Sequence, residues 1–461
     1  MRWIKLTTVS LLCLLAGSHL PWLRSAISDR PASAPQLRAL NRTAPADTWT
    51  LYDSHPNHLW NRLYRSLYQR VTRDGKDFGY DELDPLLWSE TKYLLSSPAC
   101  QQATTVLDEF LSTHGERLIS DPMKRALFQR DIWAVFDWTT EVRTESRDKA
   151  DLQLRLVKVM KRLALSPAEI KRLPNTYDQA TTSRTFAPAY NPNHPEQPFL
   201  PRDLFDSKGP WVQLSGRGGD TIARGHTDAF SGRSVFVIFM RLPGGRDATV
   251  AYLSKLSEFH NPWLQDREGP GGLRPNPGLP QFPAGTELAL VRMILLIDDQ
   301  GNLQATNLIE DAQIRVHRIV PGSIDNSRNA ARAAMDVGEF KLSRTKLFAG
   351  ESGGLRELSN EDTEFPIFAS HGIDLFEADF SGVQFERMLR EPLQFCAACH
   401  SRSGVHSVLS RAGRVLVPSW DPNYEVEGTK GWKERQANWV LLQGLWHSDA
   451  GSNHATSTNR S

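Results

Sequence analysis

The chain is poor in cysteine, has no excess of either charge, and contains no long hydrophobic run. Only 4 of its 461 residues are Cys, which excludes a fold held together mainly by disulfides. The 54 Lys and Arg residues are balanced by 53 Asp and Glu residues, so no basic field favours binding to nucleic acid. What remains is an ordinary globular composition with a length of roughly three domains. We therefore expect the function to reside in a local site.

The N-terminal segment has the layout of a secretory signal peptide. Arg2 and Lys5 precede an apolar run over residues 6–16, and small residues follow. This run is too short to span a bilayer comfortably. We assign residues 1–25 to a signal peptide and residues 26–47 to a linker, the alternative being an uncleaved N-terminal membrane anchor. Both assignments predict export, to the periplasm or to the extracytoplasmic face of a membrane.

The hydrophobic pattern predicts an α+β multidomain chain. Apolar residues at three- and four-residue spacing predict helices from about residue 48 to 172, whereas the run SVFVIFMRL at 234–242 predicts a buried strand. Helical periodicity returns in the Trp-rich run at 432–446. The expected domains, in chain order, are a helical domain at 48–190, a β-rich domain at 191–374, a small all-α domain at 375–448 and a disordered tail at 449–461.

Finer expectations concern capping, the linker and the strands. Ser166 and Glu169 have the spacing of a capping box at a helix start. The polar, proline-rich residues 173–210 are expected to form a linker on the surface. In the β-rich part we expect a short helix at 247–259, a hairpin of strands at 286–297 and 303–309, and a separate strand at 313–319.

One short motif near the end of the chain indicates a chemical function. Cys396, Ala397, Ala398, Cys399 and His400 form a C-x-x-C-H run, the attachment signature of a c-type haem. Two thiols three positions apart reach the two vinyl groups of one porphyrin, and the adjacent imidazole is placed at the iron. In this motif the chain resembles c-type cytochromes. The resemblance implies one covalently attached haem c, thioether bonds from both cysteines, His400 as an axial iron ligand, and a cytochrome c-like fold for residues 375–448.

Two other uses of the motif are weaker. A structural zinc site usually has a second Cys pair, and the chain has no other pair. A redox-active C-x-x-C of the thioredoxin type follows a strand, whereas residues 387–395 have the pattern of a helix end interrupted by Pro392.

The sixth iron ligand is not the one found in small soluble cytochromes c, because no Met follows His400. We expect His447, at the end of the Trp-rich run, to bind the iron. His406 is only six residues from His400 and is not expected to reach the other haem face. The alternatives are Met388, a residue from another domain such as His226, His317 or His371, and an open site. Side chains expected around the haem are Arg402, Arg411 and Arg414 at the propionates, and Trp420, Trp432, Trp439 and Trp446 as its walls.

The resemblance implies an exported monohaem protein that transfers one electron at a time to or from a redox partner protein. One alternative is a haem-dependent oxidoreductase of the peroxidase kind, with an open sixth site. Another is a scaffold whose β-rich domain binds a partner or a carbohydrate while the haem domain passes on electrons. The sequence does not decide whether the protein is an enzyme, assigns no catalytic residue, and leaves the oligomeric state open.

Two further sequence features are better explained by a structural role than by a catalytic one. Residues 350–354 match the G-x-S-x-G pattern of hydrolases around Ser352, but no alternation of strands and helices precedes them, so we expect a glycine-rich surface turn. Cys100 stands alone after Ser97, Pro98 and Ala99, and we expect it to be a buried thiol.

Overall fold

The structure is a computed structural model, and it describes most of the chain between residues 49 and 448. The described ranges are 49–71, 77–81, 93–95, 97–141, 145–216, 221–259, 261, 263–266, 273–320, 334–359, 404–409, 416–419 and 421–448. All of them belong to one compact unit, which spans residues 40–461. The predicted signal peptide, the linker at 26–47, the C-x-x-C-H motif and the tail lie outside the described residues.

A seven-stranded antiparallel sheet forms the centre of the fold, with strand order β10-β9-β8-β7-β4-β3-β11. Two short antiparallel pairs, β1 with β2 and β5 with β6, lie outside it. The strands of the large sheet are β3 (Val212–Gly216), β4 (Ser234–Arg241), β7 (Thr286–Ile297), β8 (Leu303–His317), β9 (Met335–Leu342), β10 (Leu355–Glu357) and β11 (Leu416–Pro418). The strands of the pairs are β1 (Arg70–Val71), β2 (Asp77–Phe78), β5 (Trp263–Gln265) and β6 (Leu273–Pro275).

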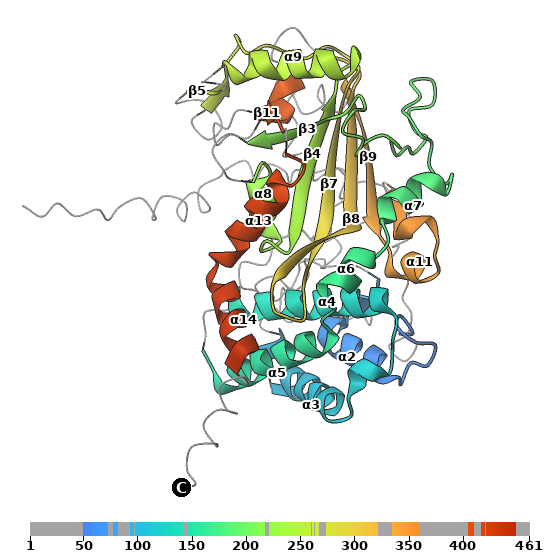
Figure 1. The fold of residues 1–461 in the computed structure, drawn as a ribbon, viewed down its shortest axis with the longest axis vertical. Helices are drawn as coiled ribbons and strands as arrows, with labels where there is room; N and C mark the ends of the chain where they lie inside the picture. The colour runs from blue at the N-terminus through green and yellow to red at the C-terminus, as the bar shows by residue number, and fades with distance from the viewer. Residues whose placement is uncertain are drawn as a thin grey trace, which may run out of the picture. The chain divides into compact units, whose positions relative to one another are not determined.

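Helices precede, interrupt and follow the sheet in the chain, so the prediction of a mixed α+β fold is confirmed (Figure 1). Before the sheet come α2 (Leu59–Tyr68), α3 (Ser97–Ser112), α4 (Pro122–Glu141), α5 (Arg147–Leu163), α6 (Pro167–Arg172) and α7 (Thr176–Thr182). Later helices are α8 (Arg224–Ala229), α9 (Gly245–Ser257), α11 (Arg344–Phe348), α13 (Tyr424–Glu434) and α14 (Ala437–His447).

One face of the sheet is apolar and shares a core with the helices. The row Val237, Val291, Ala312 and Phe340 crosses β4, β7, β8 and β9 in register, and all four side chains are buried. They belong to the same hydrophobic cluster as residues of α2, α4 and α5. Burial of apolar area at about 25 cal/mol per Å² makes this core the main stabilising element. The boundary predicted at residue 190 therefore separates two segments that share one core.

The segment at 173–210 does more than link two regions. It contains α7, and its bulky side chains cover the apolar face of the sheet; the Phe186 ring lies 4.9 Å from that of Phe340. Phe199, Leu200 and Leu204 are buried in the same cluster. The prediction of a surface linker was wrong, because scattered aromatic and aliphatic residues anchor a proline-rich stretch to the sheet.

Two other boundaries differ from the predictions. β8 is one strand of 15 residues, where we predicted separate strands at 303–309 and 313–319. The run at 432–446 was predicted as one helix, but α13 ends at Glu434 and α14 begins at Ala437. Gln436 has the extended backbone of a helix N-cap, with ψ of 143°. Neither Gly nor Pro marks this break, so the sequence pattern does not reveal it.

Several local predictions are confirmed. β4 and α9 lie where the strand at 234–242 and the helix at 247–259 were expected. At α6 the Ser166 side chain accepts from the backbone N–H of Glu169, and the Glu169 carboxylate accepts from the backbone N–H of Ser166. Cys100 is a free, buried thiol, and burial raises its pKa. Among the helices that the structure describes, none is long and apolar enough to cross a membrane.

Candidate functional site

The described residues nearest to the haem motif in the chain are 404–409. Gly404, four positions after His400, begins a short 3-10 helix that ends at Ser407. Its φ of +61° is left-handed, and a Cβ atom there would lie 2.1 Å from Oε1 of Gln281, so only glycine fits without displacing that side chain. The same Gln281 oxygen accepts from the backbone N–H of Val405 at 2.9 Å. Gln281 therefore fixes the start of this helix.

This short helix packs against the end of β8. The Arg315 guanidinium donates to the carbonyl of Ser407 at 3.3 Å, and the His406 ring lies 5.3 Å from the ring of Trp263. Val405 is fully buried, in a second hydrophobic cluster that includes Phe282. We refer to Phe282, Arg315, His317 and residues 404–409 together as the β8 end site.

His317 is the last residue of β8 and is only 2% exposed. Its ring lies edge-on to the Phe282 ring, with centroids 4.8 Å apart. Nε2 of His317 is buried and has no hydrogen-bond partner among the described residues. Burial, together with the smaller effect of the nearby Arg315 charge, lowers the pKa of His317 to about 3. The ring is therefore neutral at pH 7, the protonation state in which an imidazole binds a metal.

The sheet face that carries His317, opposite to the face described above, carries both charged residues and the second hydrophobic cluster. Leu288 pairs with Arg315, and Arg292 pairs with Asp311, so Arg292 and Arg315 lie on this same face. α8 adds His226, whose ring lies 5.3 Å from the ring of Phe236. Burial, together with the charges of Arg315 and Arg292, lowers the pKa of His226 to about 4. Two neutral imidazoles thus accompany arginines on this face.

The β8 end site contains side-chain types that haem sites use. A buried imidazole nitrogen without a partner is a ready iron ligand, because imidazole is a common axial ligand of haem iron. An arginine guanidinium suits a propionate carboxylate, and Phe282 supplies an aromatic wall. Among the described residues no group of three or more His, Cys, Asp or Glu side chains could hold a metal ion alone. Haem iron is held largely by the porphyrin, so a haem site does not need three or more protein ligands.

The structure describes some of the predicted site residues and leaves others outside the described ranges. Cys396, Cys399 and His400 lie outside the described residues, as do Met388 and His371. His447 is described: it is the last residue of α14, and its side chain is exposed. Nε2 of His447 lies 3.5 Å from the position that a Cβ atom on Gly301 would take. The structure thus places His447 at the turn between β7 and β8, and it places His317 at the other end of β8.

Three of the tryptophans predicted to surround the haem are described and buried: Trp432, Trp439 and Trp446. The Trp439 ring lies 5.9 Å from that of Trp133 in α4, and Trp446 approaches Gly301. The Trp446 carbonyl accepts from Lys161 of α5 at 2.8 Å. α13 and α14 are therefore anchored on the helices and on the β7–β8 turn. The described rings are part of the core, and their predicted place beside the haem stays a prediction, because the motif lies outside the described residues.

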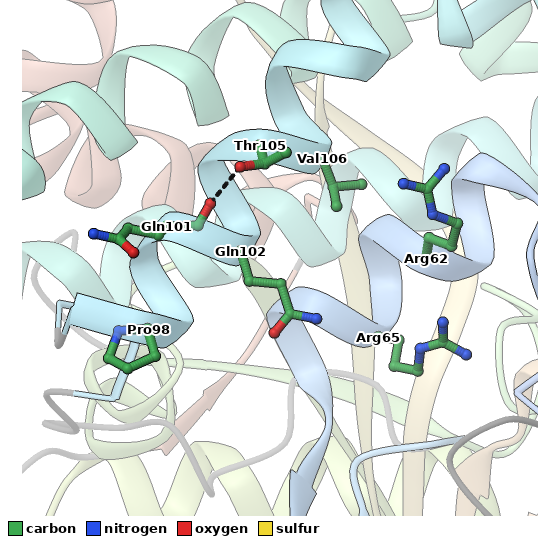
Figure 2. A pocket seen from close by; sticks show the side chains of 7 residues that line it. All are labelled: Arg62, Arg65, Pro98, Gln101, Gln102, Thr105 and Val106. Carbon is green, nitrogen blue, oxygen red and sulfur yellow. Dashed lines mark hydrogen bonds between the residues drawn. The ribbon is translucent and has the colours of Figure 1, made fainter.

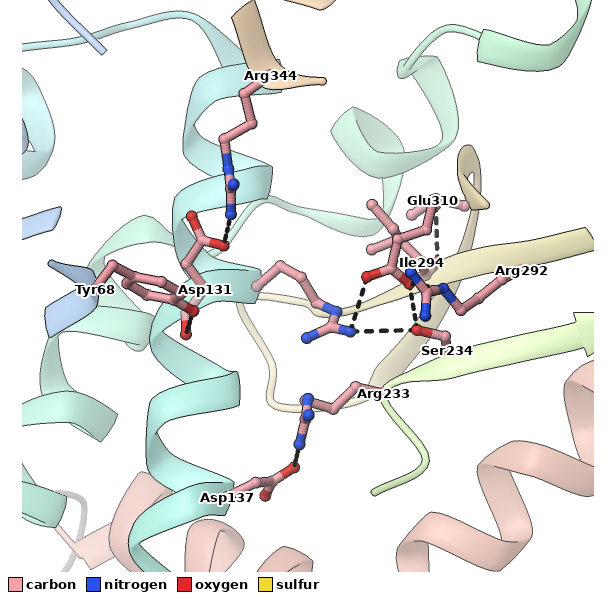
Figure 3. Close-up of polar contacts among 11 residues, drawn as sticks. Tyr68, Asp131, Asp137, Arg233, Ser234, Arg292, Ile294, Glu310 and Arg344 are labelled. Atoms are coloured by element: carbon pink, nitrogen blue, oxygen red, sulfur yellow. Dashed lines mark hydrogen bonds and ion pairs between the residues drawn. The ribbon is translucent and has the colours of Figure 1, made fainter. Parts of the chain in front are cut away.

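A buried network of charges, which the sequence did not reveal, joins α4 to the sheet and to later helices (Figure 3). Glu310 of β8 accepts from the Ser234 hydroxyl at 2.5 Å, and it forms ion pairs with Arg130 at 3.3 Å and with Arg292 at 3.1 Å. All of these side chains are nearly inaccessible to solvent. A buried carboxylate is tolerated only with such partners, so this arrangement fixes α4 on the sheet.

Asp137 is the second carboxylate of the network. It accepts from Arg233 at 2.7 Å, from Lys433 at 2.8 Å and from the side-chain amide of Asn438 at 3.0 Å. These partners come from the start of β4, from α13 and from α14. Burial lowers the pKa of Lys433 to about 8 although Asp137 opposes the shift. One carboxylate therefore connects three separate segments of the chain.

Asp131 is the third carboxylate, one helical turn and a half before Asp137 in α4. It forms an ion pair with Arg344 of α11 and accepts from the Tyr52 hydroxyl at 2.8 Å (Figure 3 shows Arg344 directed at this carboxylate). Burial raises the pKa of Asp131 to about 6 against the opposing effects of Arg344 and Tyr52. The hydrogen bonds of these carboxylates go to partners within the chain, so the network has the character of a structural element.

A hollow of about 480 Å³ lies between α2 and α3 (Figure 2). Arg62, one of its two arginines, is held by both oxygens of Glu109 at 2.8 and 2.7 Å. The Thr105 hydroxyl donates to the carbonyl of Gln101 at 2.7 Å. The lining contains no His, Cys or carboxylate, and so offers no acid, base or strong nucleophile; it consists of Arg62, Arg65, Pro98, Gln101, Gln102, Thr105 and Val106.

Ser352 is not on a nucleophile elbow. It begins a 3-10 turn between α11 and β10, whereas an elbow joins a strand to a following helix. Its hydroxyl shares a hydrogen bond with the Thr185 hydroxyl at 2.7 Å. The prediction of a glycine-rich turn is confirmed.

Comparison of the chain with protein-family models, with curated proteins and with solved structures finds no match in any of the three.

Proposed function

We propose that the protein is an exported monohaem c-type cytochrome that transfers single electrons to or from a redox partner protein. The observation that carries this proposal is the C-x-x-C-H run at residues 396–400. In this proposal Cys396 and Cys399 form the thioether bonds and His400 binds the iron from one side. The signal-like N-terminus supports it, because haem c is attached outside the cytoplasm in families that carry it.

The β8 end site adds support from residues that follow the motif in the chain. Residues 404–409 follow the motif closely and pack where a buried, neutral imidazole and an arginine lie together. When bound, the haem would supply iron that cycles between the ferric and ferrous states. The chain's own part is to hold the iron with fixed ligands, to exclude water from it, and to pair the propionates with arginine.

The test is an absorption and low-temperature EPR spectrum of the protein from a host with haem-attachment machinery. The account expects a low-spin ferric signal and sharp bands after reduction, as in six-coordinate electron carriers. High-spin ferric iron that binds cyanide or peroxide readily would overturn electron transfer as the function and would favour the haem-dependent oxidoreductase. Absence of a haem spectrum would overturn the proposal as a whole.

A further inference from the structure

We propose that Tyr52 is a redox-active tyrosine. A strong one-electron oxidant at the surface oxidises it through Tyr80, Trp49 and Tyr64, while Asp131 takes up the phenolic proton. This activity is additional to the proposed haem, and no residue of the C-x-x-C-H motif takes part in it. The inference is carried by the spacing of the aromatic rings and by the hydrogen-bond partner of each.

Four aromatic rings form a continuous path from the surface into the core. Tyr80 is partly exposed, whereas Trp49, Tyr64 and Tyr52 are at most 1% exposed. Ring centroids are 5.3 Å apart from Tyr80 to Trp49, 5.9 Å from Trp49 to Tyr64 and 5.6 Å from Tyr64 to Tyr52. Rings at these separations are in contact, and tyrosine and tryptophan lose an electron more readily than phenylalanine. An electron can therefore leave the core in short steps between neighbouring rings.

Tyr52 has the proton acceptor that its oxidation requires. A phenol that loses an electron becomes a very strong acid, so a long-lived tyrosyl radical forms where a nearby base takes up the proton. The Tyr52 hydroxyl donates to Oδ2 of Asp131 at 2.8 Å, and both side chains are buried. Burial, together with the charge of Asp131, raises the pKa of Tyr52 well above its usual value, so the phenol keeps its proton until it is oxidised.

The environment of Asp131 suits this role. Burial raises the pKa of Asp131 to about 6, while Arg344, the hydrogen bond from Tyr52 and the charge of Arg130 oppose the shift. The carboxylate is therefore mostly ionised at pH 7, and it is a stronger base than an exposed aspartate.

The step is balanced in atoms and electrons. The oxidant gains one electron from Tyr52, the phenolic O–H bond breaks, and an O–H bond forms on Asp131. The products are a neutral tyrosyl radical, a neutral carboxylic acid and the oxidant reduced by one electron. Arg344 keeps its proton throughout, and re-reduction of Tyr52 reverses both transfers.

The hydrogen bonds of the neighbouring rings differ from that of Tyr52. The Tyr64 hydroxyl donates to the carbonyl of Gly79 at 2.8 Å, and the Tyr68 hydroxyl donates to that of Asp131 at 2.7 Å (Figure 3). Nε1 of Trp49 is buried and has no hydrogen-bond partner among the described residues. A carbonyl oxygen is a far weaker base than a carboxylate, so these rings pass the positive charge on. Core packing explains the ring contacts, whereas the carboxylate on its hydroxyl sets Tyr52 apart as the end of the path.

The test oxidises the full-length holoprotein with photochemically generated tris(bipyridine)ruthenium(III), with persulfate as the final electron acceptor, and traps radicals by rapid freezing for EPR. We expect a persistent tyrosyl signal in the wild type and its loss in Tyr52→Phe. Tyr177→Phe is the matched control and should keep the signal, because Tyr177 is also buried but donates to the carbonyl of Pro201. The signal should form more slowly in heavy water, because a proton moves with the electron.

Two further variants test the path. Tyr64→Phe leaves the Tyr52 hydroxyl on Asp131 but removes an oxidisable ring, so the signal should form more slowly and in lower yield. Tyr68→Phe should form it at the wild-type rate, because Tyr68 continues from Tyr64 to Trp138 and not to Tyr52. Circular dichroism of each variant checks that it folds.

A measurement on the wild type alone keeps the inference testable where a variant does not fold. After long incubation in heavy water, electron–nuclear double resonance should show an exchangeable deuteron hydrogen-bonded to the radical oxygen, donated by the newly formed acid of Asp131. A wild type without a persistent tyrosyl radical, a signal that survives in Tyr52→Phe, or a radical without this deuteron would each overturn the inference. A protein without covalent haem would overturn the proposed function and leave this inference standing.

Discussion

Replacing Asp137 should destabilise the protein far more than replacing its partner Lys433. Asp137→Asn removes the carboxylate that forms ion pairs with both Arg233 and Lys433, and it leaves two cations buried close together. Removing one member of a buried ion pair typically costs about 3–5 kcal/mol. Lys433→Met leaves Asp137 with Arg233 at 2.7 Å and Asn438 at 3.0 Å, and it removes a cation whose pKa is already lowered to about 8. We expect this variant to change the free energy of unfolding by less than about 1.5 kcal/mol, in either direction.

Urea unfolding at pH 7, followed by tryptophan fluorescence, measures this difference. With a slope m of about 3 kcal/mol per M, Asp137→Asn should lower the urea midpoint by about 1–1.7 M, and Lys433→Met by less than about 0.5 M. Coincident transitions by fluorescence and circular dichroism are the control for two-state unfolding. Equal losses in the two variants, or a loss under 1 kcal/mol in Asp137→Asn, would refute the assignment of Asp137 as the shared partner.

The same network predicts a pH dependence. The pKa of Lys433 is about 8 in the folded protein and 10.5 in the unfolded chain. Between these values the unfolded chain binds more protons, so the free energy of unfolding contributed by this group rises with pH. The wild type should therefore gain stability relative to Lys433→Met from pH 8 to 10.5. A difference between the two proteins that stays constant over this range would contradict the assigned shift.

Two other substitutions test the packing. Arg344→Met should lower the free energy of unfolding by about 3–5 kcal/mol at pH 7 and by less at pH 5. The reason is that the buried Asp131 left behind, with a pKa already near 6, can take up a proton at the lower pH. An equal loss at both pH values in urea unfolding would contradict this. Gly353→Ala should lower the free energy of unfolding by about 2–4 kcal/mol, since φ is +59° and the new Cβ would lie 2.0 Å from the Thr176 carbonyl. Gly350→Ala, with φ of +73° and nothing within 4 Å, is the matched control and should cost only about 1 kcal/mol.

Local patterns predicted much of the secondary structure. The capping box at Ser166, the buried strand at 234–242 and the turn at 298–302 each depend on residues close together in sequence, and each lies where it was expected. Such elements are decided by side chains within a few positions. Their existence therefore follows from the sequence without knowledge of the core.

Elements decided by distant contacts were not predictable in this way. Glu310 and Asp311 interrupt the apolar alternation of β8 and lie between the two strands predicted there. In the fold Glu310 is buried against Arg130 and Arg292, which are 180 and 18 positions away, and this pairing allows the strand to continue. The irregular pairing of β7 with β8 beside Arg292 and Met293 lies at the same place.

The candidate site shows the same division between local and distant information. The motif at 396–400 is recognised from five consecutive residues, so the prediction of a haem does not require knowledge of the fold. A sixth ligand of the proposed haem depends on which side chain the fold brings near the motif, and five consecutive residues do not contain that information. Among the histidines considered, the sequence favoured His447 because it ends the Trp-rich run, which we expected to pack against the haem domain. The structure instead places His447 at the opposite end of β8 from residues 404–409.

Covalent attachment of one haem by Cys396 and Cys399 is the central claim, and haem staining after denaturing electrophoresis tests it most directly. Wild-type protein from a host with haem-attachment machinery should carry one haem that survives denaturation, and Cys396→Ala with Cys399→Ala should carry none. Cys100→Ala is the matched control and should retain the stain, because Cys100 is a free, buried thiol far from the motif in the chain. A stain retained by the double variant, or a wild type without one, would contradict the account.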